Sequence, residues 1–71
     1  MNDLLPMAEE ASFNEISHQG KTIRVGDEII IREAGETRTA TVSSIVQRQG
    51  HYWVGYDDNA KFYPWPLVQK K

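Results

Sequence analysis

The chain has 71 residues and no cysteine, which limits it to one small hydrophobic core and excludes disulfide bonds and thiolate metal sites. Its formal net charge is −2 at pH 7, and residues 21–71 carry a net charge of +2, a mild positive excess that does not indicate nucleic-acid binding by itself. No stretch has the length and hydropathy of a membrane span, and the first 20 residues lack the pattern of a secretory signal, so we expect a cytoplasmic protein.

The first 20 residues differ in charge from the rest of the chain. They contain four acidic residues and no Lys or Arg, whereas residues 21–71 contain eight basic and six acidic residues. Pro6 suits the first turn of a helix, Ser12 and Glu15 have the spacing of a capping box, and Gly20 is placed to end such a helix. Because the apolar residues between them form no helical stripe, we expect residues 1–20 to be an acidic arm, mostly disordered or with one short helix.

From residue 21 onward the pattern is that of short β-strands separated by turns. The β-branched run 29–31 follows the turn residues Gly26 and Asp27 and predicts the first strand. A turn at 34–36 leads into residues 37–46, where apolar and polar residues alternate. The alternation changes phase at Ser43 and Ser44, which predicts a β-bulge or sharp bend.

The second half of the chain continues in the same way. Residues 51–56 alternate between Tyr52, Val54 and Tyr56 on one face and Trp53 on the other. Turns are predicted at 48–50 and 57–59, a strand at 60–63, and a break in the pairing at Pro64 and Pro66. Such spacing predicts an all-β fold, a closed or nearly closed antiparallel barrel of about five strands over residues 21–71.

The order of these motifs resembles Tudor-like members of the SH3-like barrel superfamily, over roughly two-thirds of the chain. The motifs are Val25-Gly26-Asp27, an aliphatic strand, an alternating second strand, the run Tyr52 to Asp58, and an aromatic segment ending in Leu67. The resemblance implies a recognition module, commonly for peptides with modified basic side chains or for nucleic acid. An aromatic residue expected near the start of the second strand is missing from Thr37-Arg38-Thr39, which leaves any aromatic cage incomplete.

A more distant resemblance concerns an enzyme family. The chain is similar to type II plasmid-borne dihydrofolate reductases at Gly26-Asp27 and at Phe62-Tyr63-Pro64. This resemblance implies an oligomeric enzyme that builds one active pore from four chains. Ala60 and Lys61 replace the Val and Gln with which that family holds its ligands, and Ile31 stands near the place of an expected pore lysine.

The aromatic residues outnumber those that the predicted core needs. The core is predicted to contain one of Tyr52 and Tyr56 together with the following residues: Ile23, Val25, Ile29, Ile31, Ala40, Val42, Ile45, Val54, Phe62 and Leu67. Trp53, Tyr63 and Trp65 are left over, and we expect the flanking prolines to hold Trp65 extended and facing solvent. These rings cap the open end of the barrel, pack under the N-terminal arm, or form a binding surface.

Two binding hypotheses follow from this surplus. In the favoured one, an exposed aromatic face binds a protein partner; its residues are Trp53, Tyr56, Asp57, Asp58, Tyr63 and Trp65. In the alternative, Arg38, Arg48 and Lys61 bind the phosphates of a nucleic acid while the rings stack on bases. The two differ in salt dependence, because phosphate contacts weaken steeply as salt rises.

Residues that would indicate catalysis are scarce. His18 and His51 are not spaced as metal ligands, and no nucleophile motif or phosphate-binding glycine pattern occurs. Asp57 and Asp58 are adjacent in a predicted turn, so their carboxylates point apart and bring no further metal ligand with them. The sequence therefore predicts a protein without catalytic residues, cofactor or metal, and the small size favours a homodimer or homo-oligomer.

Overall fold

The computed structural model describes residues 10–71, and it confirms the prediction of an all-β protein. Its strands are β1 (Ala11–Phe13), β2 (Glu15–His18), β3 (Lys21–Arg24), β4 (Glu28–Glu33), β5 (Glu36–Arg48), β6 (His51–Tyr56), β7 (Lys61–Pro64) and β8 (Gln69–Lys70). One short 3-10 turn, η2 (Trp65–Leu67), lies between β7 and β8. Within residues 10–71, no helix has the length and apolar character needed to cross a membrane.

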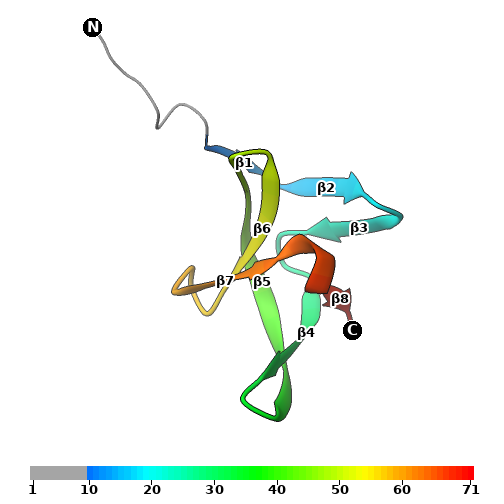
Figure 1. The fold of residues 1–71 in the computed structure, drawn as a ribbon, viewed down its shortest axis with the longest axis vertical. Coiled ribbons are helices and arrows are strands. Elements are labelled where there is room, and N and C mark those ends of the chain that lie inside the picture. The colour runs from blue at the N-terminus through cyan, green and yellow to red at the C-terminus, as the bar shows by residue number, and fades with distance from the viewer. Residues whose placement is uncertain (1–9) are drawn as a thin grey trace, which may run out of the picture.

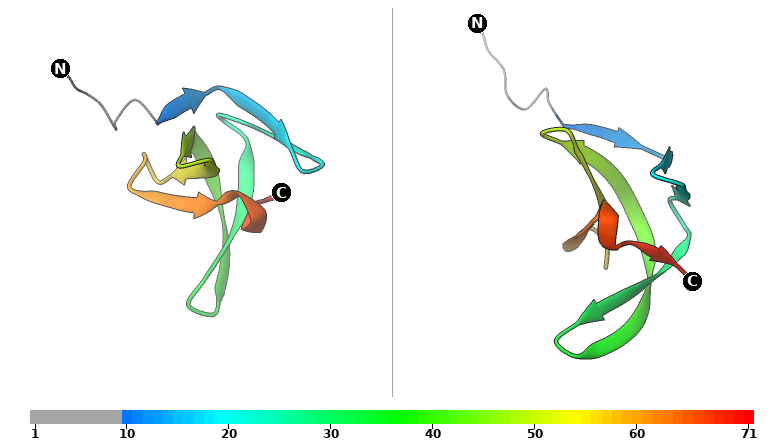
Figure 2. Two further views of the ribbon diagram at one scale, coloured as in Figure 1. Left: turned by 45° about the horizontal axis from the view of Figure 1, so that its top comes forward. Right: turned by 45° about the vertical axis from the view of Figure 1, so that its right-hand side comes forward.

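Five antiparallel strands form the main sheet in the order β7-β6-β5-β4-β8, and β1 pairs with the second half of β5 (Figure 1). β2 and β3 form a separate two-stranded sheet. It is joined to the main sheet just after β3, where the Gly26 amide donates to the Val42 carbonyl of β5 at 2.9 Å. β5 is the longest strand and curves along its length (Figure 2), so that it pairs with β4 through its first half and with β6 through its second.

The sheet is open, so the prediction of a closed barrel is wrong in this respect. The chain leaves β7 at Pro64 and passes through η2, and neither Pro64 nor Pro66 has an amide hydrogen for a ladder. A side chain bridges the gap between β7 and β4 instead. The hydroxyl of Tyr63 lies 3.2 Å from the Arg32 amide and 3.4 Å from the Arg32 carbonyl oxygen.

The predicted turns and the predicted bulge are confirmed. The register of β5 with β6 shifts between Val42 and Ser44, which allows β5 to bend. Three two-residue hairpin turns have positive φ at both positions, as type I′ turns require; they are Gln19-Gly20, Ala34-Gly35 and Gln49-Gly50. The β6–β7 turn has three consecutive residues at positive φ, from Asp57 (53°) to Asn59 (67°).

The predicted N-terminal helix is wrong where the structure describes it. Ser12 lies in β1 and pairs with Val46, and Glu15 lies in β2 and pairs with Arg24. A capping-box spacing is a weak local signal, and here the strand pairing with β5 and β3 overrides it. Gly20 belongs to a hairpin turn and ends no helix. The remainder of the predicted arm, residues 1–9, lies outside the described residues.

Most of the predicted core is confirmed, including Tyr56. The buried apolar residues are Ile23, Ile29, Ile31, Ala40, Val42, Ile45, Val46, Val54, Tyr56, Trp65 and Val68. They come from β3, β4, β5, β6 and the segment around η2. The two-stranded β2–β3 sheet therefore helps to cover the same core as the main sheet.

Two positions near η2 were predicted wrongly. Trp65 is only 2% exposed and belongs to the core, whereas Leu67 is 57% exposed. A 3-10 turn places residues i and i+3 on the same side, so Trp65 and Val68 both face inward and Leu67 faces out. Pro66 fits within this turn, where its missing amide hydrogen is not needed. The expected extended, solvent-facing Trp65 therefore does not form.

Two further core predictions are wrong because of strand parity and chain direction. Val25 is 42% exposed, since β3 ends at Arg24 and the chain turns through Gly26 at a φ of 99°. In β7, Tyr63 pairs with Val54 and packs against the core, while Phe62 pairs with Gly55 and lies on the outer face. The predicted roles of Phe62 and Tyr63 are thus exchanged.

Candidate functional site

A concave surface, here called the aromatic cleft, lies where three segments distant in sequence meet. It is lined by residues 18–19 of the β2–β3 turn, 50–53 at the start of β6, and 64–66 at the β7–η2 junction. Its volume is about 300 Å³. The sequence separation of these segments explains why strand patterns alone did not reveal the cleft.

Three rings pack against one another at the cleft. The centroid of His18 lies 5.0 Å from that of Tyr52 and 6.0 Å from that of Trp65, and the Tyr52 and Trp65 centroids are 5.7 Å apart. The indole Nε1 of Trp65 donates to the His18 carbonyl oxygen at 3.2 Å. Since Trp65 is almost fully buried, it forms the floor. The half-buried Tyr52 and Trp53 point to opposite faces of β6, and both line the cleft.

A lysine holds the β2–β3 sheet against this floor. Lys21 Nζ donates to the carbonyl oxygens of Trp65 and Val68, both at 2.7 Å, and lies 5.4 Å from the Trp65 ring centroid. Desolvation lowers the pKa of Lys21. The two carbonyls belong to the 3-10 turn and the residue after it, so one side chain fixes the position of η2 relative to the β2–β3 turn.

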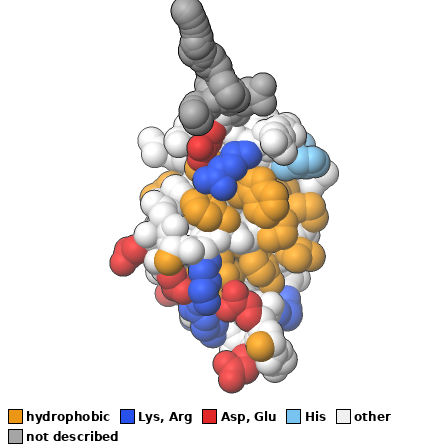
Figure 3. Space-filling view, turned by 60° about the vertical axis from the view of Figure 1, so that its left-hand side comes forward, with side chains coloured by type: hydrophobic (Ala, Val, Ile, Leu, Met, Phe, Trp, Pro, Cys, Tyr) orange, Lys and Arg blue, Asp and Glu red, His pale blue; other side chains and the backbone are white. Residues whose placement is uncertain are grey.

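Trp53 connects the cleft to the outer face of the sheet. It pairs with Val46 on one side and with Pro64 on the other, so these three side chains share that face. Figure 3 shows one face of the molecule on which hydrophobic side chains gather between charged ones. One bordering charge is Arg48, whose guanidinium lies 4.7 Å from the Phe62 ring centroid and 3.0 Å from the Glu10 carboxylate.

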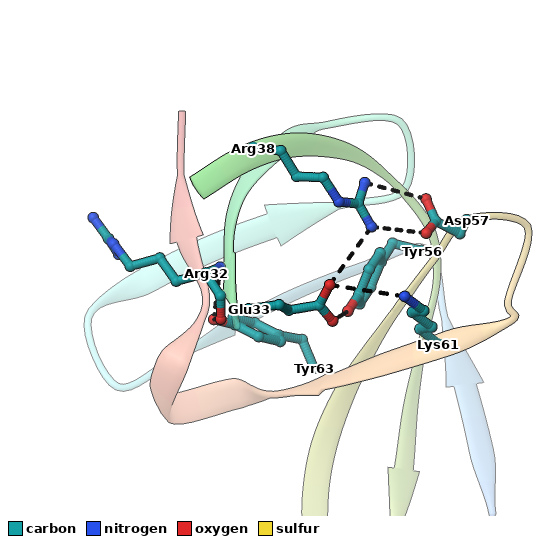
Figure 4. A network of polar contacts seen from close by, with 7 residues as sticks. All are labelled: Arg32, Glu33, Arg38, Tyr56, Asp57, Lys61 and Tyr63. Carbon is teal, nitrogen blue, oxygen red and sulfur yellow. Dashed lines mark hydrogen bonds and ion pairs between the residues drawn. The ribbon is translucent and has the colours of Figure 1, made fainter. Parts of the chain in front are cut away.

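A second group of polar side chains, here called the charged cluster, lies at the opposite end of β5 (Figure 4). Arg38 pairs with Asp57 at 2.8 Å and lies 3.9 Å from Glu33. Lys61 lies 3.8 Å from the same Glu33 carboxylate, which also accepts a hydrogen bond from the Tyr56 hydroxyl at 2.7 Å. The Arg38 guanidinium covers the Tyr56 ring at 5.6 Å. The cluster thus satisfies its charges internally.

The protonation of the charged cluster follows from these contacts. Burial, reinforced by the hydrogen bond to Glu33, raises the pKa of Tyr56 from 10.0 to about 12. The hydrogen bond with Asp57 raises the pKa of Arg38 further above its ordinary value. Tyr56 therefore stays neutral and Arg38 stays charged at any physiological pH, so neither side chain gains or loses a proton in that range.

The structure divides the residues predicted to bind a partner. Trp53 and Trp65 belong to the aromatic cleft, whereas Tyr56, only 1% exposed, and Asp57 belong to the charged cluster. Tyr63 packs edge-on to Tyr56 at 6.1 Å and bridges β7 to β4. Asp58 is exposed in the β6–β7 turn. Tyr56, Tyr63 and Trp65 therefore do not share one exposed surface.

The residues predicted to bind phosphate are also separated. Arg38 and Lys61 both lie beside Glu33, and Arg48 lies near the other end of β5 beside Glu10. Each of the three has a carboxylate partner, so they do not form a patch of unpaired positive charge. Ile31, considered above at the position of a pore lysine, is fully buried.

Sequence reasoning missed His18, Tyr52 and His51 as members of a common site. His18 and His51 each close a two-residue turn with glycine at its second position, pairing with Lys21 and Arg48 respectively. That shared local pattern is visible in the sequence, but it does not show that the two turns lie together. Among residues 10–71, no group of three or more potential metal-ligating side chains is found.

No protein-family model, curated protein sequence or solved structure matches the chain. The function is therefore inferred from the geometry of the described residues.

Proposed function

We propose that the protein is a small, non-catalytic binding module that holds a segment of a protein partner in the aromatic cleft. The observation that supports this most strongly is the cleft itself. Three segments distant in sequence converge there, and their lining is dominated by Trp, Tyr, His and Pro side chains. Trp and Tyr are the residues that most often dominate the binding energy of protein interfaces when they line a pocket.

The size of the cleft favours a peptide side chain over a cofactor. Its volume of about 300 Å³ lies at the lower end of the range of small-molecule sites, which is about 300–1,000 Å³. A space of this size accommodates one or two side chains of a partner. The remainder of the partner segment then lies across the surface on either side.

The cleft is held in shape before any partner arrives. Trp65 is fixed by its bond to His18 and by its place in the core, and Lys21 fixes the backbone of η2. A preformed site loses little conformational entropy on binding. Such a cleft is suited to recognising a segment without rearrangement of the module.

We also propose that the fold is a variant of the SH3-like barrel, open in this chain. The support is the order of its elements. β4, β5, β6 and β7 follow one another as hairpins, η2 comes next, and β8 returns to pair with β4. A Tudor-like recognition of basic side chains has less support, because Arg38 of the chain itself already covers the Tyr56 ring.

A nucleic-acid ligand is not favoured by the arrangement of charge. Phosphate binding needs Lys or Arg side chains free to replace counterions. Arg38, Arg48 and Lys61 each lie within 4 Å of a carboxylate, so binding phosphates would require breaking ion pairs. We therefore propose no second function.

The proposal is tested by selecting peptides from a random display library against the purified full-length chain. Selected peptides should lose about tenfold or more in affinity when Trp53 is replaced by Ser or the exposed His51 by Ala. The matched control is Thr39→Ala, an exposed change in β5 outside the cleft, which should leave binding unchanged. Failure to enrich any peptide, or selected peptides insensitive to both cleft variants, would reject the proposed function.

A further inference from the structure

We infer that the side chain entering the aromatic cleft is uncharged and apolar, and that it belongs to an extended segment of the partner protein. This inference rests on the proposed function and specifies its ligand. The first argument concerns charge. Residues 18–19, 50–53 and 64–66 include no Asp, Glu, Lys or Arg, so the described lining carries no fixed charge.

Each cation that lies over a ring within residues 10–71 has further polar partners in the chain. Lys21, near the Trp65 ring, donates to two backbone carbonyls. The Arg38 guanidinium over Tyr56 is accompanied by the carboxylates of Asp57 and Glu33. The cleft lining has rings but no carboxylate. A Lys or Arg side chain that entered it would lose hydration without gaining an ion pair, which is unfavourable.

An acidic side chain or phosphate would be equally poorly matched. The nearest basic groups in the chain are already engaged, since Arg48 beside Gly50 pairs with Glu10. Lys21, which closes the β2–β3 turn, donates to the Trp65 and Val68 carbonyls. An anion in the cleft would have to disrupt one of these contacts to be neutralised.

The polar atoms of the floor are also used within the chain. Trp65 uses its single indole donor for the His18 carbonyl, so it has no donor left for a ligand. Pro64 and Pro66 have no amide hydrogens, and a partner backbone therefore cannot extend the sheet along this segment. Recognition at this floor therefore comes from packing of an apolar side chain rather than from hydrogen bonds.

An exposed leucine next to the cleft offers a second apolar contact to the inferred ligand. Leu67 is 57% exposed and directly follows Pro66, which lines the cleft. An extended segment crossing this edge would place a second apolar side chain on Leu67. The inferred ligand therefore has one apolar residue in the cleft and a neighbouring apolar residue outside it.

The inference is tested with capped peptides of the form acetyl-Gly-Ser-X-Ser-Gly-amide, where X is Leu, Trp, Lys or Asp. Each peptide is titrated at millimolar concentration into the ¹⁵N-labelled full-length chain, and amide chemical shifts are followed. The Leu and Trp peptides should shift the resonances of residues 18–19 and 50–53. The Lys and Asp peptides should bind about tenfold more weakly or not at all.

The outcomes separate this inference from the proposed function. If the Lys or Asp peptide binds the cleft as well as the Leu peptide, the inference is wrong while the cleft remains a peptide site. If none of the four binds but display-selected peptides do, the inference is also wrong and the proposed function stands. Sedimentation measured without peptide supplies a further check. If the chain self-associates, and the resonances of residues 18–19 and 50–53 shift with protein concentration, the cleft binds a second copy of the chain and the inference is wrong.

The contribution of Leu67 has its own control. Leu67→Ser changes an exposed side chain and should leave the thermal stability of the chain nearly unchanged. It should weaken a display-selected peptide about three- to tenfold and leave the binding of the capped Leu peptide unaltered. Equal binding of the selected peptide to both proteins would remove the second contact from the inference.

Discussion

Gly55 is the position at which the packing leaves no room for a side chain. A Cβ atom there would lie 2.6 Å from Asn59 Oδ1, 2.6 Å from Ser44 Oγ and 2.9 Å from Phe62 Cε2. Replacing Gly55 by Ala should therefore overpack the site, at a cost of about 1–3 kcal/mol. It should also break the 2.7 Å hydrogen bond from Ser44 to Asn59, worth about 1 kcal/mol.

The expected loss of about 2–4 kcal/mol is large for so short a chain, whose total stability should be about 4–10 kcal/mol. Urea denaturation followed by tryptophan fluorescence measures it, and the midpoint should fall with no change in the m-value. The control is the same substitution in a Ser44→Ala, Asn59→Gly background, where two of the three close contacts are gone. Its cost should there fall below about 1 kcal/mol. An equal cost in both backgrounds would refute the reasoning.

Three further predictions concern single contacts. Tyr56→Phe should destabilise the protein by about 1–2 kcal/mol at pH 8, because the hydrogen bond to Glu33 is lost. The folded pKa of Tyr56 is raised from 10.0 to about 12, so this contribution is complete below pH 10 and is lost as the pH rises through 12. Urea titrations in which the stability difference between the two proteins does not change as the pH rises through this range would contradict the prediction. Lys21→Met should cost about 1–3 kcal/mol, because the carbonyls of Trp65 and Val68 lose their donor; an unchanged urea midpoint would contradict the proposed anchoring. Ala34→Asn should raise stability by about 0.5–1 kcal/mol, since Ala34 has a φ of 50°; a lower melting temperature would contradict this.

Local sequence patterns predicted the parts of the fold that local chemistry determines. Gly35 and Gly50 marked hairpin turns because their positions require positive φ, and Ser43-Ser44 marked the bulge because alternation changed phase there. The β-branched run 29–31 predicted a strand. Ile29 and Ile31 lie on its inner face and are fully buried, and Ile30 on the other face is half-buried.

The errors arose where contacts distant in sequence decide the structure. Ser12 and Glu15 carry a helical signal, but β5 and β3 offer them strand partners. Trp65 and Leu67 exchange exposure because η2 is a 3-10 turn rather than an extended segment. The cleft was missed for the same reason, since its residues belong to three segments that only the folded chain brings together.

The central claim is that the aromatic cleft binds an apolar side chain of a protein partner. The most direct measurement is an isotope-filtered NOE spectrum of the labelled full-length chain with a display-selected peptide. NOEs are expected between apolar side-chain protons of the peptide and ring protons of Tyr52, Trp53 and Trp65. NOEs confined to Arg38 and Tyr56, at the charged cluster, would contradict it.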